Sequence, residues 1–168
     1  MKKLLVIVDM QNDFITGALA NTDAQKIVSD IDEYIKNFDG YVAFTRDTHQ
    51  SNYMETQEGK KLPVPHCIEG SEGWKITDKI TQPETAVIFN KNTFGSIDLA
   101  KYIKQVGFDY VEFCGVCTGI CVINNVALTK AYCPETDIKV IERLCACVTP
   151  ESHKTAIEAM KTFQVDII

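Results

Sequence analysis

The sequence contains no apolar run of the roughly 20 residues that a membrane-spanning helix requires. Its first apolar stretch, residues 4–8, follows two lysines, an arrangement that resembles the start of a signal peptide. Asp9 ends the stretch, however, so it is too short for the apolar core of a signal peptide. We therefore expect a protein without a membrane anchor, located in the cytoplasm.

Positive charge is also scarce. The chain has 17 Lys and Arg residues against 23 Asp and Glu residues, a net charge of −6, and no segment forms a basic stripe. Phosphate backbones and anionic lipids are bound by such stripes, so we expect neither a nucleic-acid partner nor a membrane partner. The content of 45% hydrophobic and 24% charged residues is ordinary for a globular protein, and 168 residues suffice for one domain, residues 1–168, with its own core.

The seven cysteines are not the even set of a small disulfide-stabilised domain, which favours a reducing compartment. Four of them are interpreted as small hydrophobic residues: Cys67, Cys133, Cys145 and Cys147. Cys114, Cys117 and Cys121 have a spacing that thiolate metal ligands can have, and this reading stays open. It is disfavoured, because a turn from strand to helix would aim their side chains in different directions.

Short apolar runs alternate with helical patterns along the chain. The expected strands are 4–8, 41–45, 86–90, 110–114, 137–141 and 165–168. Helices are expected after a cap at Thr22 or Asp23, over 98–106, from about Thr118 to Tyr132, and from the Thr149-Pro150 start onward. This alternation predicts a parallel sheet with helices on both faces.

Reactive or charged residues stand at the ends of three expected strands: Asp9, Lys91 and, in the first helical turn after residues 110–114, Cys121. The carboxyl ends of parallel strands lie at one edge of a sheet, so these side chains are expected to meet. A carboxylate can act as general base, and a helix N-terminus lowers a thiol pKa and offers N–H groups to an oxyanion. The alternative is a plain ion pair at the rim of the sheet beside a buried cysteine.

Three segments, DMQNDF at 9–14, FNKNTF at 89–94 and CGVCTGIC at 114–121, resemble the isochorismatase-like cysteine hydrolases, whose best-known members are nicotinamidases. The resemblance spans the chain and implies a Rossmann-like α/β fold, a three-layer α/β/α sandwich around a mostly parallel sheet of about six strands. It also implies a triad of Asp9 as base, Lys91 and the nucleophile Cys121. The oxyanion hole would be the backbone N–H groups of Cys117 and Cys121, after a cis Val116–Cys117 peptide bond.

Cys117 stands where the family usually has alanine, and a thiol there would be open to oxidation at the mouth of the site. Phe14 and Val116 are expected to line the substrate pocket. Two further departures concern the substrate. Pro63 replaces an aromatic residue that commonly stacks on the pyridine ring in nicotinamidases, and residues 16–19 replace a glycine-rich stretch.

A long polar segment from Arg46 to about residue 85 carries two of the three histidines, which favours a functional loop. Asp47, His49 and His66 are ligands of the kind that bind zinc, iron or manganese. Nicotinamidases bind a metal through a matching Asp-x-His, a later His and one more His or Glu, and the metal holds the pyridine nitrogen. The resemblance therefore implies a divalent metal, zinc before iron or manganese, with Glu58 as fourth ligand and Glu55 as the alternative. Without a metal, these residues would be polar groups that cap the loop.

The sequence thus predicts a cysteine hydrolase that cleaves a small carboxamide such as nicotinamide to acid and ammonia through a thioester. One alternative is a metal-independent amidohydrolase of the same superfamily that acts on N-carbamoyl or ureido compounds. Another is a redox-responsive thiol protein without hydrolase activity. Relatives are often oligomers, so a homo-oligomer is compatible with the resemblance, although no residue pattern marks an interface.

Overall fold

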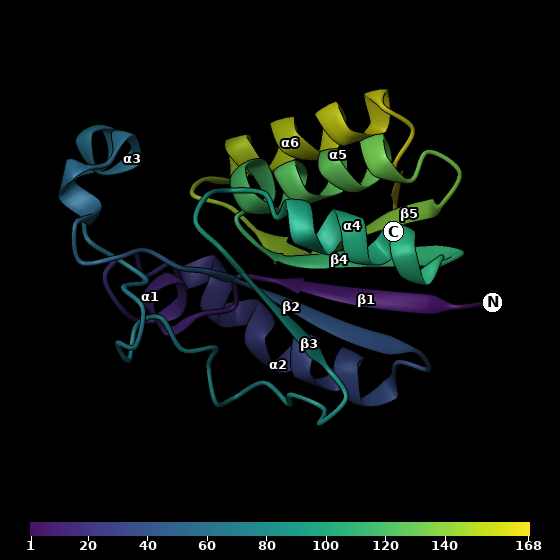
Figure 1. Cartoon of the computed structure of the whole chain (residues 1–168), viewed down its shortest axis with the longest axis horizontal. Helices are drawn as coiled ribbons and strands as arrows, with labels where there is room; N and C mark the ends of the chain where they lie inside the picture. Colours follow the sequence, from purple (N-terminus) through teal and green to yellow (C-terminus); the bar gives the residue numbers. More distant parts are fainter.

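The computed structural model describes residues 1–168 and is built on one sheet of six parallel strands (Figure 1). The strand order is β3-β2-β1-β4-β5-β6. The strands are β1 (Lys3–Val8), β2 (Tyr41–Asp47), β3 (Val87–Lys91), β4 (Tyr110–Val116), β5 (Asp137–Ala146) and β6 (Asp166–Ile167). The predicted parallel sheet of about six strands is therefore confirmed.

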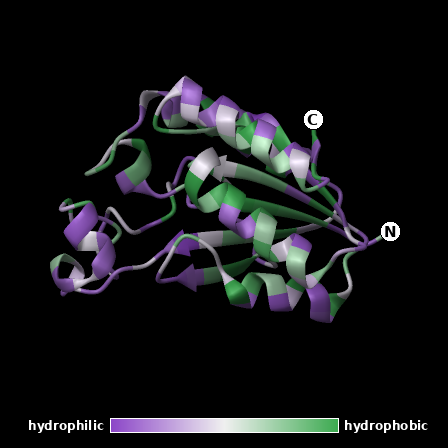
Figure 2. Cartoon of the chain, turned by 90° about the horizontal axis from the view of Figure 1, so that it is seen from above, coloured by the Kyte–Doolittle hydropathy of each residue, from purple (hydrophilic) through white to green (hydrophobic).

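Helices cover both faces of this sheet. Helix α2 (Thr22–Asn37) lies on one face, whereas α4 (Ile97–Val106), α5 (Ile123–Tyr132) and α6 (Pro150–Thr162) lie on the other (Figure 1). Their apolar sides point toward the strands and their hydrophilic sides toward solvent (Figure 2). This is the predicted three-layer α/β/α arrangement. No helix combines the length and the apolar character needed to cross a membrane.

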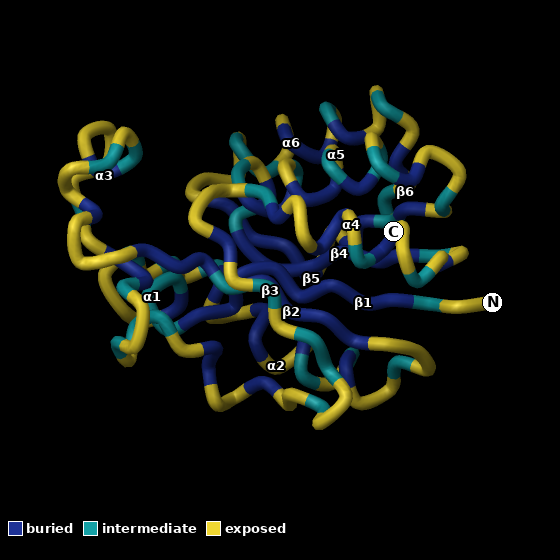
Figure 3. Tube along the Cα trace, viewed as in Figure 1, coloured by how far each residue is buried: buried dark blue, intermediate teal, exposed yellow.

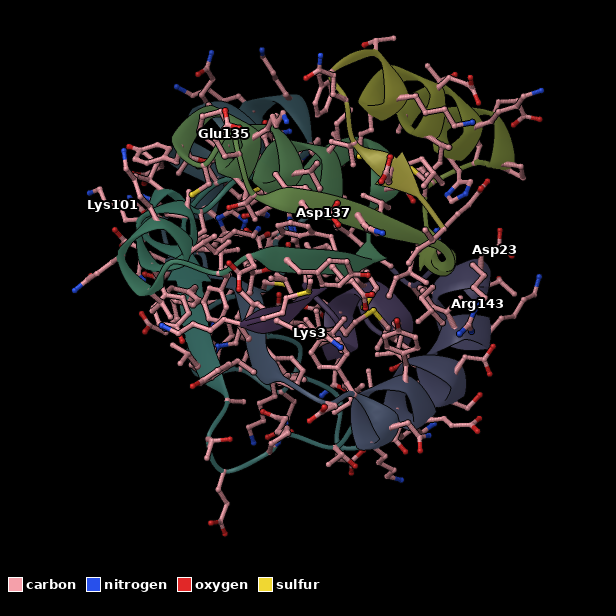
Figure 4. All side chains as sticks on the ribbon, turned by 90° about the vertical axis from the view of Figure 1, so that its right-hand side faces the viewer. Lys3, Asp23, Lys101, Glu135, Asp137 and Arg143 are labelled. Carbon is pink, nitrogen blue, oxygen red and sulfur yellow. The ribbon has the colours of Figure 1, made fainter.

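The central strand β1 forms the middle of the core. Each residue from Leu4 to Val8 is 0% exposed, because the two helical layers cover both faces of the strand (Figure 3). The amino ends of the strands, seen in Figure 4, are surrounded by charged surface side chains such as Asp137 and Glu135. Buried charged groups gather instead at the carboxyl ends.

Three local expectations differ from the structure. Asn21, rather than Thr22 or Asp23, caps α2, and its side chain accepts hydrogen bonds from two N–H groups of the first turn. β5 continues to Ala146, because a register shift against β4 accommodates the exposed Glu142 and Arg143 that interrupt its apolar pattern.

The segment after β4 does not begin as an α-helix. Residues Thr118–Val122 form one π-helical turn, in which the carbonyl oxygen of Cys117 accepts hydrogen bonds from the N–H groups of Ile120 and Val122. Helix α5 follows from Ile123. π-Helical turns of this kind are frequent at functional sites.

The long segment between β2 and β3 is ordered. It contains a 3₁₀ turn (Tyr53–Glu55) and the short helix α3 (Gln57–Lys61), which projects beyond the carboxyl ends of the strands (Figure 1). Two isolated β-bridges hold the segment in place. One joins His49 to Ile68 within the segment, and the other joins Ile76 to Gln11, which precedes the short helix α1 (Asn12–Ile15). The segment thus closes over the edge of the sheet where Asp9 lies.

Gly115 allows β1 and β4 to approach each other next to this edge. Its φ is 113°, and a Cβ at this position would lie 2.2 Å from the carbonyl oxygen of Val8. By contrast, Gly107 at the end of α4 has a φ of 70°, and a Cβ there would meet nothing within 4 Å. Only the first position combines an unfavourable backbone angle with a collision.

We therefore expect Gly115→Ala to lower the free energy of unfolding by more than about 3 kcal/mol, because it adds overpacking to backbone strain. Gly107→Ala, which adds only the left-handed backbone penalty, should cost about 1–2 kcal/mol. Urea unfolding of both variants measures the difference. Equal losses would show that the close approach of the two strands does not constrain residue 115.

Candidate active site

The structure brings together the three residues predicted at separate strand ends. The Lys91 ammonium nitrogen lies 2.6 Å from Asp9 Oδ2 and donates a hydrogen bond of 3.5 Å to Cys121 Sγ. All three side chains are buried: the residues are 0%, 5% and 6% exposed for Asp9, Lys91 and Cys121. The arrangement is therefore more than an ion pair at the rim of the sheet.

The topology explains this meeting. β1 and β4 are neighbours, whereas β3 lies beyond β2, so the long Lys91 side chain reaches across the end of β2 to contact Asp9. Asp9 has a φ of 49°, a conformation that aspartate tolerates better than most residues but that still stores strain. The Thr45 hydroxyl on β2 donates a 2.6 Å hydrogen bond to Asp9 Oδ1 and holds the carboxylate in place.

Burial controls the protonation of this group. It raises the pKa of Asp9 against the opposing effect of the Lys91 ammonium. It also raises the pKa of the Cys121 thiol, and the Asp9 carboxylate adds to that shift while Lys91 opposes it. The expectation that the helix N-terminus lowers this thiol pKa is wrong, because removal from water and a nearby negative charge outweigh it.

Lys91 keeps its charge. Burial by itself lowers the pKa of the ammonium, but the negative charges of Asp9 and Asp47 raise it above its ordinary value. The resting site therefore holds an ammonium and a protonated thiol. Because the sulfur is a weak nucleophile in this form, it needs a base within reach, and Asp9 is the group placed to serve.

The turn before Cys121 also has the expected backbone geometry. The Val116–Cys117 peptide bond is cis, and no backbone carbonyl accepts the N–H of Cys117. This N–H, together with that of Cys121, is the predicted pair of oxyanion donors.

Cys121 faces an apolar cavity of about 470 Å³. The apolar residues that line it are Phe14, Ala18, Leu19, Ala20, Leu62, Phe94, Val116, Cys117, Ile120, Cys121 and Val148. The predicted pocket residues Phe14 and Val116 are both in this lining. Asp47, Glu58 and His66 line the same cavity, so Cys121 and three of the candidate metal ligands share one space.

Four candidate ligands converge at this cavity. One donor atom from each of Asp47, His49, Glu58 and His66 lies within 4.8 Å of all the others. Nε2 of His49 and Nε2 of His66 lie 3.0 and 3.5 Å from Asp47 Oδ2, and 3.6 and 3.8 Å from Glu58 Oε1. Two imidazoles and two carboxylates so arranged fit a divalent transition metal.

The surroundings orient these ligands. Although burial opposes it, contact with both histidines holds the pKa of Asp47 well below its usual range. His66 Nδ1 lies 2.8 Å from the Val64 carbonyl oxygen, and this contact directs its Nε2 toward the cluster. Glu55, the alternative fourth ligand, is exposed and lies outside the cluster.

Three supporting residues were not identified from the sequence: Thr45, Gln11 and Tyr53. The Gln11 side-chain amide accepts from the N–H of Asp47 and donates to its carbonyl oxygen. The Tyr53 ring packs edge-on against both His49 and His66. Only Thr45 could have been suspected from the sequence. It is the last residue of the predicted strand 41–45, and Asp9 directly follows the predicted strand 4–8, so both lie at strand ends.

The chain is similar to known proteins over its whole length. A family model described as Isochorismatase domain matches residues 3–168. The nicotinamidase/pyrazinamidase of Mycobacterium tuberculosis is 26% identical over 184 residues, which cover 99% of this chain and 98% of the relative.

Solved structures agree. The pyrazinamidase of Pyrococcus horikoshii, in complex with zinc, matches with a TM-score of 0.89 at 28% identity, over 100% of this chain and 99% of that one. The nicotinamidase/pyrazinamidase PncA of Bacillus subtilis matches with a TM-score of 0.81 at 25% identity, over 99% of both chains. With a family match from residue 3 to the last residue and the whole fold shared with these structures, this protein belongs to the isochorismatase family.

Proposed function

We propose that this protein is an amidase that hydrolyses a nicotinamide-like carboxamide to the acid and ammonia, with Cys121 as nucleophile. The observation that carries the proposal is the contact of Lys91 with both Asp9 and Cys121 at an apolar cavity. The full-length similarity to nicotinamidases and pyrazinamidases supports the substrate class.

The first half of the reaction uses the buried carboxylate. As Cys121 Sγ attacks the amide carbon, its proton passes to Asp9, whose pKa is raised by burial, which makes the carboxylate a stronger base than an exposed one. The N–H groups of Cys117 and Cys121 stabilise the oxyanion. Collapse of this intermediate breaks the C–N bond, and Asp9 gives its proton to the departing ammonia.

The second half releases the acid. A water molecule gives a proton to Asp9 and attacks the thioester carbon, the C–S bond breaks, and the proton returns to the sulfur. Lys91 stays charged throughout and stabilises whichever partner, Asp9 or Cys121, is negative. The proton thus cycles between two groups and leaves the site unchanged.

Asp47, His49, Glu58 and His66 would hold a divalent metal, and the zinc complex of the Pyrococcus relative supports zinc before iron or manganese. When bound, the metal supplies a Lewis acid that can hold a nitrogen of an aromatic amide. Because the ligands line the same cavity as Cys121, they can orient a small substrate toward the sulfur. Their convergence disfavours the metal-independent alternative that acts on N-carbamoyl or ureido compounds.

Cys121→Ala should lower amide turnover by at least about 10⁴-fold, because it removes the nucleophile. Ammonia release from nicotinamide, pyrazinamide and a ureido compound measures the loss. Cys133→Ala at the end of α5, away from the cavity, is the matched control and should retain activity. Substantial turnover by correctly folded Cys121→Ala protein would refute the thioester mechanism.

Glu58→Gln should weaken metal binding by at least about tenfold, because it takes a carboxylate from the cluster. Glu55→Gln, a change of the same type three residues away and outside the cluster, should bind metal as the parent protein does. Metal content after dialysis, followed by ammonia release with and without chelator, tests both effects. Full activity in metal-free protein would instead favour the metal-independent amidohydrolase.

A further inference from the structure

Two cysteines outside the triad directly follow the ends of neighbouring strands, β4 and β5. Gly115 pairs with Cys145 and Val116 with Ala146 in the β4–β5 ladder, and Cys117 and Cys147 are the next residue on each side. Neighbouring strands lie about 4.8 Å apart, within the Cα separation of about 4.4–6.8 Å that a disulfide spans. The two side chains lie close enough for each thiol to shift the pKa of the other.

Cys147 has surroundings that favour a thiolate. The Gly119 N–H donates a 3.4 Å hydrogen bond to its sulfur. It lies three positions before Pro150, the first residue of α6, where the helix dipole is positive. The neighbouring Cys117 thiol, the largest cause, lowers the pKa of Cys147 to about 5, and burial opposes this shift. Cys147 is buried, as expected, but its sulfur also has polar neighbours.

Three other cysteines near this edge of the sheet have thiols whose pKa is raised rather than lowered. Burial raises the pKa of the Cys121, Cys114 and Cys145 thiols. All four of these cysteines, Cys147 included, are buried, so exposure does not favour any of them; since the thiolate is the form that oxidants attack, Cys147 is the favoured target among them. Cys117, which lines the cavity, is the partner positioned to resolve the oxidised sulfur.

We propose that Cys147 and Cys117 form an oxidation site at which a hydroperoxide converts the two thiols to a disulfide. The Cys147 sulfur attacks one peroxide oxygen, the O–O bond breaks, and the sulfur becomes a sulfenic acid as the first water or alcohol leaves. The Cys117 sulfur then attacks the Cys147 sulfur, the S–S bond forms, and the S–O bond breaks to release a water molecule. Two thiols thus supply the two electrons and two protons that reduce one hydroperoxide.

The disulfide has a consequence for hydrolysis that rests on the proposed function. Cys117 lines the cavity, and its N–H is a proposed oxyanion donor. Tying its side chain to Cys147 restrains this residue, so oxidation should lower amide turnover. A thiol reductant should restore it, because the bond is reversible.

The test is peptide mapping of the full-length protein after titration with hydrogen peroxide and alkylation of the remaining thiols. We expect loss of two of the seven thiols, and a link between tryptic peptides 105–130 and 144–154 that fragmentation assigns to Cys117 and Cys147. Cys147→Ser should abolish the link, whereas the matched control Cys133→Ser should keep it. Alkylation rates against pH should show one thiol of low pKa in the parent protein and none in Cys147→Ser.

Activity is a separate readout. Oxidised parent protein should lose about 100-fold in turnover, as for the loss of one oxyanion donor, and recover with dithiothreitol. Cys147→Ser should be as active as the parent before oxidation and should lose much less under the same mild treatment. A link that includes Cys121, a link that persists in Cys147→Ser, or no link at all would overturn the proposal. If the mapped link forms in a protein without amidase activity, the oxidation site stands and the proposed function fails.

Discussion

The buried contact between Lys91 and Asp9 is the interaction on which the rest of the site depends. Neither group is solvated, so each charge is tolerated only because the other lies 2.6 Å away. Removing one partner of such a pair leaves a buried charge uncompensated. The contact therefore fixes the protonation of the site as well as its shape: it keeps an ammonium beside the sulfur and a carboxylate ready to accept a proton.

Different neighbours give the thiols of Cys121 and Cys147 opposite pKa shifts, although both are buried. Cys121 lies among buried charges, and its thiol stays protonated until a base removes the proton. Cys147 accepts a hydrogen bond from the Gly119 N–H and lies beside Cys117, so its pKa falls. One carboxyl edge of the sheet thus holds two sulfurs whose surroundings shift their pKa values in opposite directions.

The candidate metal ligands come from the end of β2 and from the segment that leaves the sheet after it. Asp47 ends β2, whereas His49, Glu58 and His66 belong to the excursion between β2 and β3. Gln11 and Tyr53 hold this excursion against the sheet, so ligands spread over twenty positions meet in one cluster. The cavity is apolar on the side of Phe14, Phe94 and Val116 and polar at the ligands, as a small aromatic amide would require.

The sequence by itself determined the alternation of strands and helices, the parallel sheet and the positions of Asp9, Lys91 and Cys121 at its carboxyl edge. These follow from local periodicity and from the rule that parallel strands end at one edge. The choice of Glu58 over Glu55, the help of Thr45 and Gln11, the π-helical turn and the opposite pKa shifts of Cys121 and Cys147 were decided only by the tertiary structure. Each depends on burial and on distances between residues far apart in the chain, and the energy of a charge or a thiolate is set by such surroundings rather than by its sequence neighbours.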